Sequence, residues 1–325
     1  MAARLNPAPL GVSPPIVDLR TVGAAALEPI LQEETAAWRA ELDWDFDKSA
    51  DLVRRFVDLR ALNGSALIEH GEVTGYLYYV LEESKGLVGD LYVRHAVRTR
   101  ERENLLLESA IDSITANHHI HRVESQLMML SYDPRRTLPA SGAASSYDRN
   151  FMRVKLPAAD LGEGRVRRPM YIERWSDLYQ DDAAQLIAKA YAGHVDSRIN
   201  DQYRSILGAR RFLHNIVEYP GCGTFFRTAS FAAFEAATGR MCGISLASLV
   251  ATDCGHITQI CVSPQVRGTG IGHALLRRSL LTLREVGCRA ASLTVTSSNE
   301  GAVELYERVG FTTIRKFSAF AWEGL

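Results

Sequence analysis

The sequence predicts an α/β protein made of two domains of similar design. Three observations support this prediction. The chain has 325 residues, which is long for one domain and comfortable for two. Near the C-terminus, a strand-like run is followed by a glycine-bearing turn and a helix-periodic run. An altered copy of that strand and helix occurs in the first half, which indicates an internal repeat.

The composition is that of an ordinary globular protein, with 46% hydrophobic and 23% charged residues. The net charge of −1 gives no overall field that would favour nucleic acid or a membrane surface as a partner. No apolar run approaches the length of a membrane span. Residues 1–15 are rich in proline and lack the apolar segment of a signal peptide, so we expect a flexible tail.

The cysteines are odd in number, form no C-x-x-C pair and mostly flank apolar runs: Cys222, Cys242, Cys254, Cys261 and Cys288. This usage favours a reducing cytoplasm over a compartment in which disulfides form. We therefore expect buried, neutral thiols and no metal site.

The turn near the C-terminus is the most informative segment of the chain. The apolar run 257–262 predicts a strand, and the periodic run 271–286 predicts a helix. The glycines between them leave backbone N–H groups open, and the helix N-terminus adds partial positive charge, so the turn is suited to hold a phosphate. His273 stands where a P-loop needs lysine, and it also breaks the G-x-G-x-x-G pattern of dinucleotide folds.

A second motif follows the first. The run 290–296 predicts another strand, and 299–310 predicts a short helix. Asn299 suits the N-cap of that helix, and Gly310 suits the position that ends it.

These two motifs together resemble those of the GNAT family of N-acetyltransferases, over roughly residues 239–320. Gln265, Gly268 and Gly270 match the family pattern Q/R-x-x-G-x-G/A, and 299–311 matches N-x-x-A-x-x-L-Y-x-x-x-G-F. The resemblance implies a mixed, mostly antiparallel sheet flanked by helices in each domain. It also implies that an acyl group, usually acetyl, moves from coenzyme A to an amine by direct attack.

The resemblance further implies roles for individual residues. Tyr306 matches the family's general acid, which protonates the departing thiolate. A backbone N–H of the strand before the turn polarises the thioester carbonyl. The residues expected to bind acetyl-CoA are Ile260, Cys261, Val262, Gln265, Val266, Arg267, Gly268, Thr269, Gly270, Ile271, Gly272, Asn299 and Tyr306. Within this set we interpret Cys261 as a small buried side chain, and for Arg267 a cofactor contact and simple solvation remain equally open.

The general base is not fixed by the motifs. Many relatives carry a glutamate on the strand before the turn, whereas this chain has Thr258 and Gln259. His256 is one candidate, acting through a water molecule. His194 and Asp196 are others, because their polar segment is expected to border the acceptor pocket and to hold the amine. A solvated loop is the alternative interpretation of that segment.

An offset of 169 positions aligns Val93 with Val262 and the helix-periodic run after each. At this offset Glu101 replaces Gly270 and Glu103 replaces Gly272. Carboxylates would repel a pyrophosphate, so we expect the first domain not to bind coenzyme A there. Residues 73–77 match 241–245 at an offset of 168, and 147–151 are matched with 306–311.

We therefore predict a flexible tail (1–15), a degenerate GNAT-like domain (16–157), a linker (158–168) and a catalytic GNAT domain (169–325). The leading functional hypothesis is acetyl transfer from acetyl-CoA to a primary amine of a small molecule or peptide. The alternative is a non-catalytic acetyl-CoA-binding sensor or assembly module, and transfer to a hydroxyl or of a longer acyl group remains open. The expected state is a monomer, as a pseudo-dimer of tandem domains, or a homodimer.

Overall fold

The computed structural model describes residues 14–219 and 221–325, so the predicted tail lies almost entirely outside the described residues. The described strands form one continuous sheet in the order β1-β2-β3-β4-β5-β13-β6-β12-β11-β10-β9-β7, with β8 paired to β10 beside this path. Only the pairs β4–β5 and β11–β12 within this sheet are parallel. The predicted fold class, a mixed and mostly antiparallel sheet in two GNAT-like units, is confirmed.

The two halves contribute similar sets of elements. The first half contains the strands β1 Ile16–Asp18, β2 Asn63–Glu69, β3 Glu72–Glu82, β4 Lys85–Val93, β5 Arg122–Gln126 and β6 Ala144–Lys155, and the helices α1 Ala24–Leu42, α2 Asp47–Asp58 and α3 Arg100–Thr115. The second half contains the strands β7 Met170–Arg174, β8 Thr224–Phe225, β9 Phe231–Glu235, β10 Met241–Ala251, β11 Cys254–Val262, β12 Ala290–Thr296 and β13 Thr312–Glu323. Its helices are α4 Gln180–Ala190, α5 Asp196–Ile199, α6 Ile206–Glu218, α7 Ile271–Glu285 and α8 Glu300–Val309.

Helices cover both faces of the sheet because successive residues of a strand point to opposite faces. On β3, Tyr76 packs in a cluster with the apolar residues of α1 and α2, whereas the next residue, Leu77, packs with those of α3. In the second half, Ile244 of β10 packs with α4 and α6, and the neighbouring Gly243 lies against Leu275 of α7. The strands and helices predicted around the two C-terminal motifs are all present.

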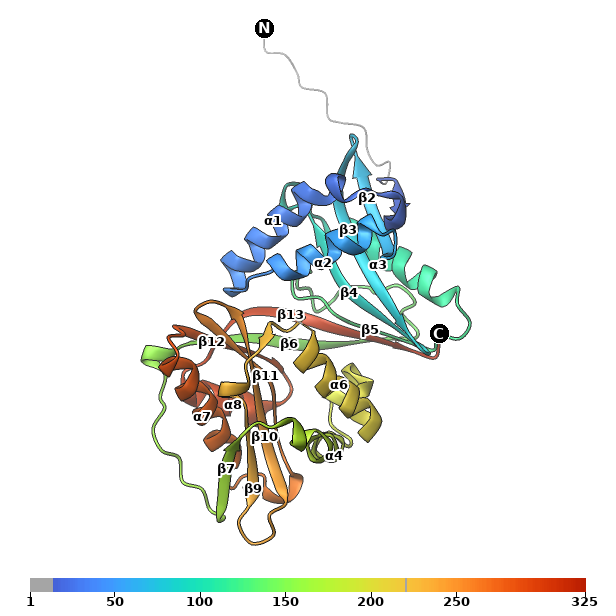
Figure 1. The fold of residues 1–325 in the computed structure, drawn as a ribbon. Coiled ribbons are helices and arrows are strands. Elements are labelled where there is room, and N and C mark those ends of the chain that lie inside the picture. The colour runs from blue at the N-terminus through green and yellow to red at the C-terminus, as the bar shows by residue number, and fades with distance from the viewer. Residues whose placement is uncertain (1–13, 220) are drawn as a thin grey trace.

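The last strands of the two halves lie beside strands of the opposite half. Strand β6 pairs with β12 of the second half, and β13 pairs with β5 of the first half and with β6. Figure 1 shows β6 and β13 running side by side across the middle of the molecule. The boundary at 158–168 remains our proposal for where the repeats join, but neither half completes its part of the sheet alone.

The internal repeat is visible in the irregularities of the strands. A bulge leaves Gly89 unpaired between β3 and β4, and a bulge leaves Thr258 unpaired between β10 and β11, at the predicted offset of 169. A second pair of bulges, at Thr74 and Cys242, falls at the predicted offset of 168. Related folds tend to retain their β-bulges. The occurrence of bulges at matching positions in both halves therefore supports the duplication.

One part of the predicted repeat is wrong. Residues 147–151 lie within the extended strand β6, whereas 306–311 form the last turn of α8 and the connection after it. Strand β6 instead corresponds to β13, which has the same length of 12 residues at an offset of 168. The short sequence likeness was misleading, because a similar spacing of aromatic residues occurs here in a strand and at the end of a helix.

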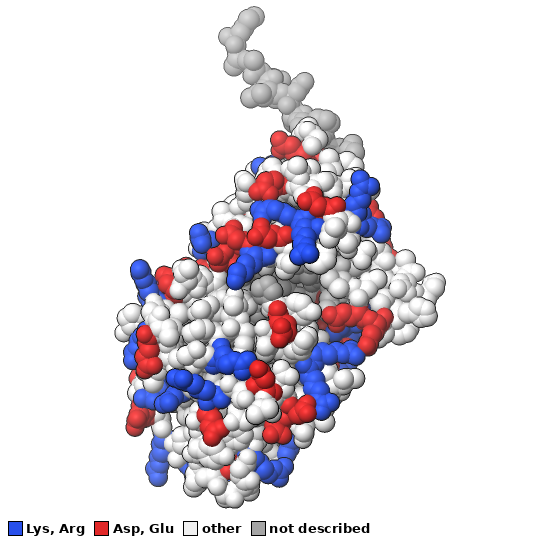
Figure 2. Space-filling view, viewed as in Figure 1, with Lys and Arg blue, Asp and Glu red and all other residues white. Residues whose placement is uncertain are grey.

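Charges of both signs are interspersed on one face of the molecule. On the face drawn in Figure 2, lysine and arginine alternate with aspartate and glutamate, without a region of one sign. None of the helices in the described part of the chain is long and apolar enough to span a membrane.

Candidate active site

A cleft opens where two parallel strands separate. Strands β11 and β12 pair from Cys254–Ala290 to Ile257–Leu293 and then diverge, next to the bulge at Thr258. A cavity of about 540 Å³ occupies the region between the diverging end of β11, the N-terminal turn of α7 and helix α8. It is lined by Ala190, Tyr191, His194, Ile260, Cys261, Val262, Val266, Arg267, Gly268, Gly270, Ile271, Gly272, His273, Asn299, Gly301, Ala302, Leu305, Tyr306 and Arg308.

The predicted cofactor residues therefore converge, with two exceptions. Gln265 and Thr269 are absent from the lining of the cavity. The Gln265 side chain instead accepts a hydrogen bond from Ser263, and the Thr269 hydroxyl donates to the Val266 carbonyl over 2.6 Å. Both side chains bond to other residues of the turn, so their predicted direct contact with the cofactor is not supported.

The glycines of the turn have conformations that explain their presence. Gly268 has φ of +74° and Gly270 has φ of +91°, a region that residues with a Cβ adopt at a cost. A Cβ on Gly270 would also lie 2.4 Å from the Arg165 carbonyl oxygen. The linker therefore packs directly behind the turn, and the Arg167 amide donates to the Thr269 carbonyl over 2.9 Å.

Arg267 has a structural partner that the sequence did not indicate. Its Nη2 atom donates a hydrogen bond of 2.6 Å to the carbonyl of Ala190, at the C-terminal end of α4. Carbonyl groups at a helix C-terminus lack partners within the helix and attract positive charge. The Arg267 side chain thus ties the glycine turn to α4 while still lining the cavity.

Tyr306 lies on α8 with its ring buried in the wall of the cavity. Its hydroxyl has no hydrogen-bond partner among the described residues. Burial raises the pKa of Tyr306, and the nearby Asp196 carboxylate raises it further, while Arg149 acts in the opposite direction. The phenol is therefore protonated at neutral pH and is available as a proton donor.

His194 and Asp196 lie next to each other, but of the two only His194 lines the cavity, so a direct place for Asp196 in the acceptor pocket is not supported. The Asp196 amide donates to Nδ1 of His194 over 3.2 Å, and Thr296 at the end of β12 donates to the Asp196 carboxylate. Nε2 of His194 lies 3.4 Å from the side-chain amide of Asn299. Asn299 holds the N-cap position of α8 as predicted, but its side chain makes no capping bond and contacts His194 instead.

The strand position that holds glutamate in many relatives is occupied by an ordered amide. Gln259 is buried, donates to the Tyr191 hydroxyl over 2.9 Å and accepts from the Tyr203 hydroxyl over 3.3 Å. The two tyrosine rings stack with centroids 4.4 Å apart. Neither tyrosine was identified from the sequence as part of the site, although Tyr191 opens the polar segment that was.

The cysteine prediction is largely confirmed. Cys222 is exposed, and the other four cysteines are buried. Cys261 lines the cleft, but burial raises its pKa to about 12, so it is a neutral thiol at physiological pH. It contributes surface to the cleft, and nothing in its surroundings activates it as a nucleophile.

His256 does not belong to the site, and its predicted role as general base is wrong. It lies where β11 is paired on both sides, buried against Trp44 and Phe151, with Nδ1 2.8 Å from the Ser292 hydroxyl. Burial lowers its pKa to about 3, and it does not line the cavity. Its aromatic neighbours come from the first half of the chain, so its own segment could not reveal this burial.

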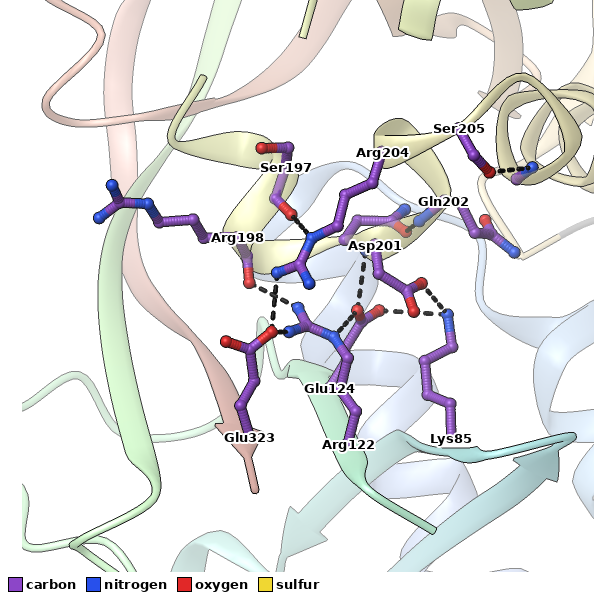
Figure 3. Close-up of polar contacts among 12 residues, drawn as sticks. Lys85, Arg122, Glu124, Ser197, Arg198, Asp201, Gln202, Arg204, Ser205 and Glu323 are labelled. Carbon is purple, nitrogen blue, oxygen red and sulfur yellow. Dashed lines mark hydrogen bonds and ion pairs between the residues drawn. The ribbon is translucent and has the colours of Figure 1, made fainter. Parts of the chain in front are cut away.

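A network of buried charges fixes the segment that carries Asp196 to the first half. Figure 3 shows Lys85 of β4 between Asp201, at 2.6 Å, and Glu124 of β5, at 3.5 Å. The Asp201 amide also donates to Glu124 over 2.8 Å. Lys85 and Glu124 are less than a tenth exposed, so these charges are strongly coupled.

The same network reaches the C-terminal strand. Arg122 of β5 pairs with Glu124 and with Glu323 of β13, and it donates to the Arg198 carbonyl over 2.6 Å. Arg204 pairs with Glu323 at 2.8 Å and donates to the Ser197 carbonyl over 2.7 Å. Residues 196–204 are therefore held between the two halves.

The first half closes the position that corresponds to the glycine turn. Glu103, which replaces Gly272, is 1% exposed and pairs with Arg136 at 2.5 Å. It also accepts hydrogen bonds from the Ser131 amide at 3.0 Å and the Ser131 hydroxyl at 2.8 Å. A buried ion pair thus stands where the second half has its glycine turn, and it adds a carboxylate that would repel a pyrophosphate.

Comparison with known proteins agrees with this geometry. The model of the acetyltransferase (GNAT) family matches residues 173–311. A mycothiol acetyltransferase from Gordonia bronchialis is 30% identical over 173 residues, which cover 47% of this chain and 54% of that protein. The chain thus spans about half the length of this relative and less of others, 19% in one case.

Two solved structures share the whole architecture. An N-acetyltransferase of this family from Sphaerobacter thermophilus has a TM-score of 0.64 and 18% identity, over 95% of both chains. A tandem GNAT protein from the clavulanic acid biosynthesis pathway has a TM-score of 0.61 and 18% identity, over 96% of this chain and 98% of that one. Residues 173–311 thus match the GNAT acetyltransferase family, and the two halves together have the tandem form of the GNAT fold.

Proposed function

We propose that the protein is an N-acetyltransferase that moves acetyl from acetyl-CoA to a primary amine, using the cleft in its second half. The observation that carries this proposal is the continuity of one cavity from the glycine turn at the N-terminus of α7 to the hydroxyl-bearing wall at Tyr306. One end suits a pyrophosphate, and the other offers a proton donor beside a polar segment.

The residues present fit acetyl-CoA. A Cβ on Gly268 would meet no atom within 4 Å, so the space beside this residue is open. Without a side chain there, the backbone of the turn is accessible. Nδ1 of His273 is buried in the wall and has no hydrogen-bond partner in the described ranges. Val266 to Gly272 would hold the pyrophosphate through backbone amides, and the end of β11 at Ile260 to Val262 would face the thioester, which supplies the activated acetyl group when bound.

The remaining chemistry falls to side chains at the far end of the cleft. The acceptor nitrogen bonds to the carbonyl carbon as the carbon–sulfur bond breaks, and Tyr306 donates the proton that the departing sulfur takes up. His194 in the cavity wall, or Asp196 beside it, would accept a proton from the acceptor ammonium, directly or through water. An ammonium acceptor loses two protons, the sulfur gains one, and one is released to solvent.

The test is Tyr306→Phe. Acceptor-dependent release of free thiol should fall about 100-fold or more, because a positioned general acid contributes that much. The Kd for acetyl-CoA measured by calorimetry should stay the same, since the ring remains. Tyr203→Phe is the matched control. It removes another nearby hydroxyl, which binds Gln259 and takes no part in the proposed proton transfer.

Unchanged turnover in Tyr306→Phe would remove this residue from the mechanism. Tight acetyl-CoA binding without turnover over a broad panel of amines would favour the non-catalytic sensor or assembly module. The observation that favours this alternative is Gln259, an amide on the strand where many relatives have a glutamate.

A further inference from the structure

The first half places a charged side chain behind the wall of the cleft, next to Asp196, although neither residue lines the cavity itself. Arg149 lies on β6, directly opposite Thr296 of β12, and Thr296 in turn binds Asp196. The Arg149 guanidinium lowers, and the Asp196 carboxylate raises, the pKa of both Tyr306 and Tyr203. Both charges therefore lie beside the phenols at this end of the site.

Arg149 is buried but short of partners. The residue is 9% exposed, and its Nε atom is enclosed without a hydrogen-bond partner among the described residues. Nη2 donates to Thr294 over 3.2 Å, and Nη1 lies 3.9 Å from Asp196, which is beyond hydrogen-bonding distance. A guanidinium has five N–H donors, and leaving donors of a buried charge unpaired is costly.

The guanidinium keeps N–H donors that no described residue accepts, and a planar guanidinium can bind a carboxylate through two parallel hydrogen bonds once the side chain is reached. Asp196 is the carboxylate within 4.0 Å of Arg149 in the described part of the chain, and the two charges balance without binding each other tightly. A ligand with one positive and one negative group would satisfy both and keep the site neutral. A cationic amine alone would leave Arg149 as it is and would compete with it for Asp196.

We propose that the acceptor is a zwitterion of the α-amino acid type, whose carboxylate binds Arg149 and whose ammonium binds Asp196. This inference rests on the proposed function and names its substrate class. The short separation of the two protein charges favours an acceptor whose own charges are carried on neighbouring atoms. The acceptor site then spans both halves, with the second half supplying Asp196 and Tyr306 and the first half supplying Arg149.

The experiment compares acceptors that differ only in the negative charge. Each of the common L-amino acids is assayed beside its own carboxamide, with acetyl-CoA, by release of free thiol and by mass of the product. The amine of a carboxamide loses its proton more readily, so chemistry alone favours the carboxamide. We expect at least one amino acid to exceed its carboxamide in kcat/KM by about 10- to 150-fold, the value of a hydrogen bond to a charged group.

Arg149→Gln should abolish this preference by lowering kcat/KM for the amino acid to the level of its carboxamide, while the Kd for acetyl-CoA stays constant. Arg149→Lys keeps the charge without the planar fork and should retain part of the preference, which makes it the deciding variant if Arg149→Gln does not fold. Arg153→Gln is the matched control, because Arg153 lies on the same strand and pairs with Asp43, away from the cleft.

Equal use of acids and carboxamides, or a preference that survives in both Arg149 variants, would overturn the inference and leave the proposed function standing. Acetyl-CoA binding without acetylation of either series would overturn the substrate class. Failure to bind acetyl-CoA would overturn the proposed function itself.

Discussion

Gly272 and Glu103 hold the same position in the two repeats and give it opposite properties. Glycine in the first turn of α7 leaves an open cavity wall, whereas Glu103 in the first turn of α3 is buried and pairs with Arg136. The first half thus carries a buried ion pair at the position where the second half has an open wall.

A second matched pair is Asp90 and Gln259. Asp90 is buried beside Glu34, and Glu34 accepts hydrogen bonds from Tyr76 at 2.5 Å and Trp38 at 3.2 Å. Burial raises the pKa of Asp90 to about 6, and burial together with the Asp90 charge raises that of Glu34 well above its usual range. The first half therefore retains an acid at the strand position where the second half has an amide, but encloses it.

This enclosure predicts a stability that depends on pH. An Asp90 pKa raised from 3.8 means that the folded state binds the proton more tightly, so stability is greatest below about pH 4 and falls as the pH rises to about 6. This rise in the pKa lowers the free energy of unfolding by about 3 kcal/mol at neutral pH. Asp90→Asn should therefore gain about 2 kcal/mol more, relative to wild type, at pH 7.5 than at pH 4.5 in urea unfolding. A difference in unfolding free energy that does not change with pH would contradict this prediction.

The site residues that could be predicted from the sequence differ in one respect from those that could not. Gly268, Gly270 and Tyr306 were predicted because their neighbours in the chain are also their neighbours in the site. Arg149 was missed because it reaches the site from the other half, 47 residues before its partner Asp196 by sequence position. For the same reason, His256 was misjudged, since its enclosing partner Trp44 lies far away in the chain.

At the scale of elements, the site depends on how strand ends and a short helix are held. The parallel pair β11–β12 ends at Ile257, so the strands diverge and open the cleft. The short helix α5 and the turn 201–204 pack Ile199 and Tyr203 into the core. Their position is also supported by the Lys85–Asp201 ion pair to β4, by hydrogen bonds to Glu124 and Arg122 of β5, and by the exposed Arg204–Glu323 pair to β13. These elements were predictable as a polar segment beside the pocket, but the charges that fix them were not.

This arrangement assigns a positioning role to Glu124, which contacts no substrate. Glu124→Gln removes its charge from Lys85 and Arg122, and breaking such a buried pair costs about 3–5 kcal/mol of stability. We expect the KM for the acceptor to rise about tenfold as the segment 196–204 loosens, with the Kd for acetyl-CoA unchanged because the glycine turn is independent of this network. Asp177→Asn, which breaks the exposed pair with Arg227, is the control. Equal effects on acceptor and acetyl-CoA would indicate general destabilisation instead.

At the scale of the whole molecule, the two repeats form one sheet with exchanged last strands. Periodicity identifies β6 and β13 as strands, but it cannot tell which neighbours each will have, because pairing is decided by contacts far apart in the sequence. In the structure, β13 lies between β5 and β6, and β6 lies between β13 and β12 (Figure 1). This exchange brings Arg149 next to Asp196 of the second half, so the degenerate repeat adjoins the site through a strand rather than through its own cleft.

The central claim is that one of two repeats binds acetyl-CoA, at the glycine turn of α7. The most direct measurement is calorimetric titration of acetyl-CoA into wild type, Gly272→Gln and Gly272→Glu. A Cβ at this position meets only ordinary contacts, at 3.5 and 3.9 Å, so neither substitution strains the backbone. The two side chains have the same size and differ in charge. The account predicts one molecule bound per chain, and binding at least about tenfold weaker in Gly272→Glu than in Gly272→Gln. Two molecules bound per chain, or equal affinity in the two variants, would contradict it.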